Sequence, residues 1–289
     1  MQATIGIVGN GFVGNAVAQG FQSHFKISGF HDKFEVRVYD VDKDKSTHSY
    51  METLTSDYVF VCLPTPMISV DGGKCNLSIL EDFFDDIPST IDGTFIIKST
   101  VPIGTTDIFV KKYPYLKIIH NPEFLTAANA ENDFINSDRH VIGGDKRIAY
   151  GLEKIYEYCF PGTPVYIMKS NESEAVKYFS NCFLASKVMI FNEMKILCDS
   201  ISGMDYNKII EAVTSDSRIG ESHTSVPGPD GEYGFGGTCF PKDINALIYT
   251  MEENGIDPLI LKSVWEQNKK YRLNWDWAEN TSAVMSEKL

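Results

Sequence analysis

The sequence predicts an α/β protein in which a doubly wound parallel sheet is followed by a mainly helical domain with a long central helix. Short β-branched runs alternate with helical segments through the first half of the chain, which is typical of a parallel sheet covered by helices on both faces. Residues 172–202 then contain neither Pro nor Gly and repeat apolar residues at helical spacing. We therefore place a domain boundary between residues 169 and 170.

The predicted strands are short runs rich in Val, Ile, Phe and Tyr. They cover residues 4–8, 35–39, 57–62, 94–97 and 116–119, with weaker signals at 140–142 and 163–167. Between them, residues 15–25 and 77–87 have helical spacing.

The second half of the chain is predicted to be helical. Apolar faces run along residues 172–202, formed by Val176, Phe179, Phe183, Val188, Phe191, Met194 and Leu197. Such a helix would be on the order of 45 Å long, and it can join two domains or pack against a symmetry mate. Further helices are expected at 206–213, 244–253 and 259–270, and the Gly/Pro-rich residues 226–237 form a long loop that is a candidate functional segment.

Composition limits the class of protein. The 289 residues are 43% hydrophobic and carry a formal net charge of -13, so we expect a sizeable core and neither a nucleic-acid partner nor an anionic membrane partner. We expect no signal peptide and no membrane span, because no apolar run approaches roughly 20 residues. The six cysteines show no CxxC pair, which favours a reduced, cytoplasmic setting in which most thiols are buried.

A glycine-rich turn, GNGFVG at residues 9–14, follows the first predicted strand and opens a helix. Gly9 permits the tight turn, Gly11 lets the backbone approach a pyrophosphate, and Gly14 allows close helix–strand packing. Asp40 ends the next strand, where its carboxylate can accept hydrogen bonds from a ribose and would repel a 2′-phosphate. The pattern predicts a Rossmann-like NAD site; a flavin site, a nucleotide-only site and a degenerate site are the alternatives.

Cys239 lies in the segment GGTCFPKD at residues 236–243. The paired glycines allow the backbone to crowd a ligand, and a lysine and a carboxylate lie within four residues of the thiol. A nearby ammonium favours the nucleophilic thiolate. The alternative is a buried cysteine before a helix that begins near Pro241.

Two further patterns are candidates for catalysis. Lys177 and Asn181 are four residues apart and share a helix face, where both can donate to a developing oxyanion; the alternative is a solvated polar face. Thr100 (in KSTVPIG, 98–104) and Glu123 (in NPEFL, 121–125) follow strands, where carboxyl ends meet a cofactor; the alternative is turn or capping groups. The histidines have no paired spacing, so we predict no metal site.

Seven motifs occur together and in order along the chain. They are GNGFVG, LPTP (63–66), KSTVPIG, NPEFL, ESEAVKYFSN running into FNE (172–193), DSRIG (216–220) and YGFGGTCFPKD (233–243). The chain resembles the UDP-glucose/GDP-mannose dehydrogenase family in these motifs, which cover most of residues 4–270.

The resemblance implies a four-electron oxidation of UDP-glucose to UDP-glucuronate, as in polysaccharide biosynthesis, with two NAD reduced. Cys239 would attack the intermediate aldehyde, and a thiohemiacetal would become a thioester that water releases as the acid. Lys177 and Asn181 would hold the oxygen. Asp243 and Glu123 would transfer protons or order the water, with Thr100 beside Glu123.

The resemblance also implies binding residues. NAD would be lined by Gly9, Gly11, Val13, Gly14, Asp40, Lys45, Thr65, Thr100 and Lys242. The nucleotide sugar would be held by Glu123, Phe124, Leu125, Lys177, Asn181, Arg218, Tyr233 and Gly236. Residues 1–169 would form the NAD-binding domain, and residues 170–289 would carry the cysteine and form a homodimer in which the arginine reaches across.

Three departures from the family pattern qualify this expectation. Ala127 replaces a usual glutamate, the stretch between Asp40 and Asp57 is short, and no second Rossmann-like domain follows the central helices. The loop before Tyr233 is also longer, which would compensate for the missing domain. Two other functions therefore stay open: a two-electron 3-hydroxyacid-type dehydrogenase, which needs no cysteine, and a non-catalytic binder of NAD or nucleotide sugar. The motifs also fit GDP-mannose and N-acetylated UDP-sugars.

Overall fold

The computed structural model describes residues 3–28, 34–126 and 129–285. The chain packs as two compact units, the first formed by Met1–Thr65 with Leu77–Lys177 and the second by Pro66–Asn76 with Tyr178–Leu289. The boundary expected at residues 169 and 170 therefore differs from the packing in two ways. Residues 66–76 belong to the second unit, and the first two turns of the long helix belong to the first unit.

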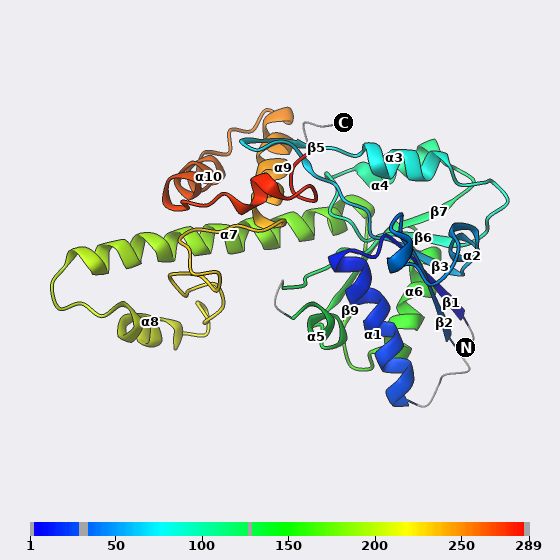
Figure 1. The fold of residues 1–289 in the computed structure, drawn as a ribbon, viewed down its shortest axis with the longest axis horizontal. Helices are drawn as coiled ribbons and strands as arrows, with labels where there is room; N and C mark the ends of the chain where they lie inside the picture. Colours follow the sequence, from blue (N-terminus) through cyan, green and yellow to red (C-terminus); the bar gives the residue numbers. More distant parts are fainter. Residues whose placement is uncertain (1–2, 29–33, 127–128, 286–289) are drawn as a thin grey trace. The chain divides into compact units, whose positions relative to one another are not determined.

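The first unit is built on a sheet with strand order β2-β1-β3-β6-β7-β8-β9 (Figure 1). Its strands are β1 (Ala3–Val8), β2 (Phe34–Tyr39), β3 (Tyr58–Val61), β6 (Thr94–Ile97), β7 (Lys117–His120), β8 (His140–Gly143) and β9 (Val165–Met168). Each predicted strand is confirmed. The β7–β8 pair is antiparallel, whereas the other neighbouring pairs described in this sheet are parallel.

Helices cover both faces of this sheet because its buried strands alternate their side chains between two cores. Ile5, Ile7, Phe60, Ile96 and Ile119 pack in one core with α1 (Phe12–Ser28), α5 (Ala130–Ile135) and α6 (Lys146–Cys159). The intervening residues pack in the other core with α2 (Tyr50–Leu54), α3 (Ser78–Asp85) and α4 (Thr105–Lys112). Period-two burial of this kind is the expected property of a strand with two covered faces. The doubly wound prediction is thereby confirmed.

The order in which successive strands are added to the sheet reverses at β1, which lies between β2 and β3. β2 lies on one side of β1 and β3 on the other, so the loops after β1 and β3 leave their strands on opposite sides. In open α/β sheets the ligand crevice lies outside the carboxyl ends of the strands at such a switch point. The sheet order therefore puts the glycine turn after β1 at the expected ligand edge.

The second unit is mainly helical. Its helices are most of α7 (Ser170–Ser200), α8 (Tyr206–Thr214), α9 (Phe240–Glu253) and α10 (Leu259–Tyr271). A hairpin of β4 (Met67–Ser69) and β5 (Gly72–Cys75), which the sequence analysis did not predict, packs against α9. The predicted helices at 172–202, 206–213, 244–253 and 259–270 are confirmed to within a few residues.

The tail beyond α10 is part of this second unit. A 3₁₀ helix, η2 (Asp276–Glu279), carries Trp277, which is fully buried. Its indole N–H donates to Val70 O at 3.2 Å. The backbone of Met67 pairs with the chain at Val284, so the tail closes over the hairpin.

Candidate functional site

The glycine turn after β1 has the geometry that a dinucleotide needs. Gly9 has φ of 88°, which other residues rarely adopt. A Cβ at residue 14 would lie 1.8 Å from Gly9 O, whereas a Cβ at residue 11 would meet nothing within 4 Å. Gly14 therefore serves internal packing, and Gly11 faces open space at the start of α1, where unpaired N–H groups favour a pyrophosphate.

Asp40 is held beside this turn. Its Oδ2 accepts from Asn10 N at 2.6 Å, and its Oδ1 accepts from Asp42 N at 2.9 Å. Asn10 Nδ2 donates to Lys45 O at 2.7 Å, which fixes the Lys45 backbone near the glycine turn. Each carboxylate oxygen keeps acceptor capacity, so these residues fit the adenosine ribose of NAD. Val13 packs against the core beneath the turn.

The loops that follow β3 and β6 are joined by hydroxyl groups. Thr65 Oγ1 donates to Thr100 O at 2.7 Å, and Ser99 Oγ donates to Leu63 O at 2.6 Å. The structure thus brings together Thr65 and Thr100, both predicted to line the cofactor.

A buried ion pair joins Lys177 on α7 to Glu123 after β7. Lys177 Nζ donates to Glu123 Oε1 at 2.7 Å and to Glu123 O at 2.8 Å, and Leu125 N donates to Glu123 Oε2 at 2.6 Å. Burial alone would raise the pKa of Glu123, but the attraction of Lys177 outweighs it and the pKa is lowered. Glu123 is therefore an ionised, oriented carboxylate.

A second buried lysine, Lys98, approaches the same turn and was missed by sequence reasoning. Its Nζ donates to Asn121 Oδ1 at 2.8 Å and to Pro122 O at 3.1 Å. Burial lowers the pKa of Lys98 to about 8. The signal available in the sequence was a lysine directly after the apolar run 94–97. The structure shows this lysine at 3% exposure, and buried lysines are rare unless they are paired.

Glu174, on the first turns of α7, was also not predicted from the sequence to have a role near the site. Its carboxylate accepts from Thr106 N at 2.7 Å and from Thr106 Oγ1 at 2.6 Å, and it also accepts from Gly104 N. Burial raises the pKa of Glu174. This carboxylate caps α4 and holds the end of the KSTVPIG segment.

Phe124 is half-buried and lies beneath a cation. The guanidinium of Arg139 is 4.2 Å from the Phe124 ring centroid, and Lys177 Nζ is 5.7 Å from it. Leu125 packs against the core on the α1 side of the sheet.

In the second unit, a fully buried carboxylate gathers two predicted site residues. Asn181 Nδ2 donates to Asp243 Oδ2 at 2.6 Å, and Lys242 Nζ donates to Asp243 Oδ1 at 2.5 Å. Burial opposes the charge of Lys242, but attraction to Asp243 prevails and its pKa is raised. The Lys242 ammonium thus forms an ion pair with Asp243.

Cys239 is the residue before α9, at its N-cap. It is half-buried, and its thiol lies 3.7 Å from Thr238 Oγ1. Burial raises the pKa of Cys62 and Cys159 to about 12. Those two thiols are therefore inert, whereas Cys239 has the partly exposed helix-start position typical of reactive cysteines.

The remaining predicted substrate residues, Arg218, Tyr233 and Gly236, all belong to the second unit. The Arg218 side chain is 88% exposed and pairs with Asp216 at 2.6 Å. Tyr233 packs beside the cluster of Phe191 and Tyr206. A Cβ at Gly236 would lie 2.3 Å from Arg272 Nη2, whereas Gly237 has open space and φ of 74°. Of the paired glycines expected to crowd a ligand, Gly236 is crowded by the protein itself.

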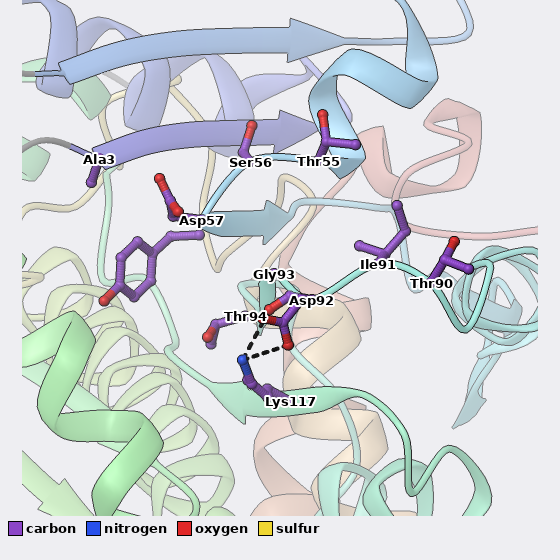
Figure 2. Close-up of a pocket in the computed structure, with 11 residues that line it drawn as sticks. Ala3, Thr55, Ser56, Asp57, Thr90, Ile91, Asp92, Gly93, Thr94 and Lys117 are labelled. Carbon is purple, nitrogen blue, oxygen red and sulfur yellow. Dashed lines mark hydrogen bonds and ion pairs between the residues drawn. The ribbon is translucent and has the colours of Figure 1, made fainter.

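A hollow of ≈ 470 Å³ lies at the opposite end of the strands. It is lined by the residues that begin β1, β3, β6 and β7, and Figure 2 shows Lys117 bonded to Asp92 there. Because dinucleotides bind at carboxyl ends, this hollow is not the cofactor site.

Among the described residues, no group of three or more His, Cys, Asp and Glu side chains is arranged to hold a metal ion. No helix in the described part of the chain is long and apolar enough to cross a membrane. Ala127, which replaces the usual glutamate, lies outside the described residues.

The fold and the glycine turn define a dinucleotide-binding protein of the Rossmann class. Two family models then match the sequence: the NAD binding domain of the UDP-glucose/GDP-mannose dehydrogenase family over residues 32–160, and its central domain over residues 171–270. The chain belongs to the UDP-glucose/GDP-mannose dehydrogenase family. The predicted cofactor, NAD, is confirmed by the match to the family's NAD binding domain.

Individual relatives agree with this assignment. The UDP-glucose 6-dehydrogenase of Rickettsia prowazekii (strain Madrid E) is 36% identical over 250 residues, covering 82% of this chain and 55% of the relative. The structure of a UDP-glucose dehydrogenase from Pyrobaculum islandicum matches with a TM-score of 0.78 at 29% identity, covering 93% of this chain and 68% of that one.

A 3-hydroxyisobutyrate dehydrogenase of Mycobacterium tuberculosis shares the fold, with a TM-score of 0.71 at 16% identity over 94% of each chain. The chain spans about half the length of the curated relatives it matches, 55% for the Rickettsia enzyme.

Proposed function

We propose that the protein oxidises the primary alcohol of UDP-glucose to the carboxylate of UDP-glucuronate, with NAD as oxidant and Cys239 as covalent nucleophile. One observation carries the proposal: a half-buried cysteine directly precedes α9, and the first turn of that helix bears a buried Asp243 that binds Asn181 and Lys242. A purely structural cysteine would not need this polar cluster beside it.

The first unit supplies groups for the alcohol oxidation. The ionised Glu123 can accept a hydrogen bond from the substrate hydroxyl or from a water, and Lys177 can donate a hydrogen bond to an oxygen that gains negative charge. NAD, when bound, accepts a hydride in each of the two oxidations. The cofactor would be bound by Gly11, Asp40, Thr65 and Thr100. Two further contacts with NAD stay predictions, those of Lys45 and Lys242.

The second unit supplies the covalent step. The Cys239 sulfur adds to the aldehyde carbon, and the carbonyl oxygen takes the proton from the thiol to give a thiohemiacetal. Loss of hydride and of the hydroxyl proton leaves a thioester, which one water hydrolyses to the acid and the free thiol. Each turnover thus consumes two NAD and one water, and covalent attachment keeps the aldehyde from escaping. Asn181 would bind the oxygen, and Asp243 would hold Asn181 in place.

We also propose a cytoplasmic homodimer formed by residues 170–289, with Arg218, Tyr233 and Gly236 holding the nucleotide sugar. The support is an apolar stripe along α7, in which Phe179 is 61%, Phe183 68%, Ile190 51% and Leu197 57% exposed. A continuous exposed apolar stripe is typical of an association surface. The Arg218 side chain is 88% exposed, and its guanidinium would exchange Asp216 for a substrate in the partner protomer.

The experiment is a coupled NADH assay over UDP-glucose, GDP-mannose and N-acetylated UDP-sugars. We expect two NADH per acid with UDP-glucose, and no acid from Cys239→Ser, because serine lacks thiolate nucleophilicity. One NADH per substrate with activity that survives alkylation of Cys239 would instead establish a two-electron 3-hydroxyacid-type dehydrogenase. Absence of turnover over the whole panel would establish a non-catalytic binder.

A further inference from the structure

The backbone that leads into Cys239 is held by side chains from the end of α10 and the turn after it. Phe235 N donates to Asn268 Oδ1 at 2.7 Å, and Asn268 Nδ2 returns a bond to Phe235 O at 3.0 Å. Gly237 N donates to Asp276 Oδ2 at 2.9 Å. These hydrogen bonds hold the backbone of Phe235 and Gly237, which lie four and two residues before Cys239.

Arg272 connects the two anchoring points. Its side chain is 2% exposed, and its Nη2 lies 2.7 Å from Asp230 Oδ2 and 3.1 Å from Asp276 Oδ1. Its Nε donates to Asn274 O at 2.9 Å. Because a buried guanidinium with two carboxylates is costly to displace, Arg272 keeps Asp276 directed at Gly237.

Two glycines of the YGFGG segment are required by this anchor. A Cβ at Gly234 would lie 2.3 Å from Asn268 Oδ1, and a Cβ at Gly236 would lie 2.3 Å from both Arg272 Nη2 and Asp276 Oδ1. Contacts this short are sterically excluded, so larger residues at either position would displace the anchor. The side chain of Phe235 is buried between Trp265 and Phe240, with ring centroids 6.4 and 6.0 Å away.

We propose that Asn268, Arg272 and Asp276, spaced four residues apart, are positioning residues that hold residues 234–237 and thereby set the place of the Cys239 thiol. The chemical consequence rests on the proposed function, since it concerns the covalent step. The structural consequence does not: without the anchor, the amides of Phe235 and Gly237 lose their side-chain acceptors, and the segment gains conformational freedom next to the N-terminus of α9.

The test compares Asp276→Ala with Glu279→Ala, a matched substitution of an exposed acidic residue in the same 3₁₀ helix. We expect Asp276→Ala to accelerate amide hydrogen exchange across residues 233–239 by about tenfold or more, and Glu279→Ala to leave it unchanged. kcat should fall in Asp276→Ala while the KM for NAD stays constant. Asp276→Asn keeps an acceptor for Gly237 N and should restore most of the protection.

A steric variant tests the same anchor independently. Gly236→Ala should accelerate exchange in residues 233–239, and adding Arg272→Ala should reverse part of this effect by freeing the space. Unchanged exchange in Asp276→Ala, or acceleration spread evenly over the chain, would overturn the proposal. Hydrogen exchange needs no substrate, so the anchor stands if these residues respond even where the enzyme shows no turnover.

Discussion

At the scale of single residues, two buried lysines hold the turn that follows β7. Lys98 binds Asn121 and Pro122 O, and Lys177 binds Glu123 through both its carbonyl and its carboxylate. Unpaired charges are strongly disfavoured in a core, so each lysine is stable there because the turn supplies oxygen acceptors. The turn, in return, presents Glu123 in one ionised orientation.

The shifted pKa of Lys98 predicts a pH-dependent stability. Burial lowers its pKa from 10.5 to about 8, although Cys62 and Glu123 oppose the shift and Lys177 reinforces it. Between these values the unfolded chain binds a proton that the folded protein has lost, so the free energy of unfolding rises with pH. Lys98→Met lacks this titration. Between pH 8 and 10.5, its free energy of unfolding should therefore fall behind that of the parent by up to about 3 kcal/mol.

Urea unfolding at either end of that window measures the effect of Lys98→Met. Lys111→Met, at an exposed position of α4, is the control and should show the same difference from the parent at both pH values. A constant difference for Lys98→Met would contradict the shifted titration.

At the scale of elements, most strands and helices follow from local patterns, because burial on two faces or along one stripe repeats every few residues. The helices α2, α4, α5 and α6 were not predicted. α4 illustrates the reason: it has no side-chain cap of its own, and its N-terminal amides are satisfied by Glu174, 68 residues from Thr106. Its start is therefore stabilised by a distant element.

The glycine turn that opens α1 predicts two separable defects. Gly14→Ala places a Cβ 1.8 Å from Gly9 O, so it should lower the free energy of unfolding by about 3 kcal/mol. Gly11→Ala meets open space, so it should leave stability unchanged and weaken NAD binding by about tenfold, because the methyl group occupies the pyrophosphate path. Urea unfolding and calorimetric NAD titration separate the two. Equal effects of both variants on stability would refute this division.

At the scale of the whole molecule, the chain passes between its two units at residues 65–66, 76–77 and 177–178. α7 takes part in both units: it contributes Lys177 and Glu174 to the first and Asn181 to the second. The family models divide the chain differently: the NAD binding domain matches residues 32–160 and the central domain matches residues 171–270, so residues 66–76 and 171–177 fall on the other side of the division.

The apolar stripe of α7 predicts the assembly state. Phe183→Glu should convert the proposed homodimer to a monomer in light scattering coupled to gel filtration, because a charge replaces a side chain that is 68% exposed in the isolated chain. Ser200→Glu adds the same charge at an exposed position near the end of α7 and should remain dimeric. A parent protein that is monomeric at micromolar concentration would exclude the dimer.

The sequence by itself determined where the strands lie along the chain, the glycine turn with Asp40, the long helix and the family of this protein, because each of these features depends on residues close together along the chain. The tertiary structure decided the rest. Lys98 meets Pro122, Gly237 meets Asp276, and Trp277 meets Val70, at separations of 24, 39 and 207 residues. Such contacts carry no local periodicity, because they depend on which distant backbone group is left without a partner when the elements pack.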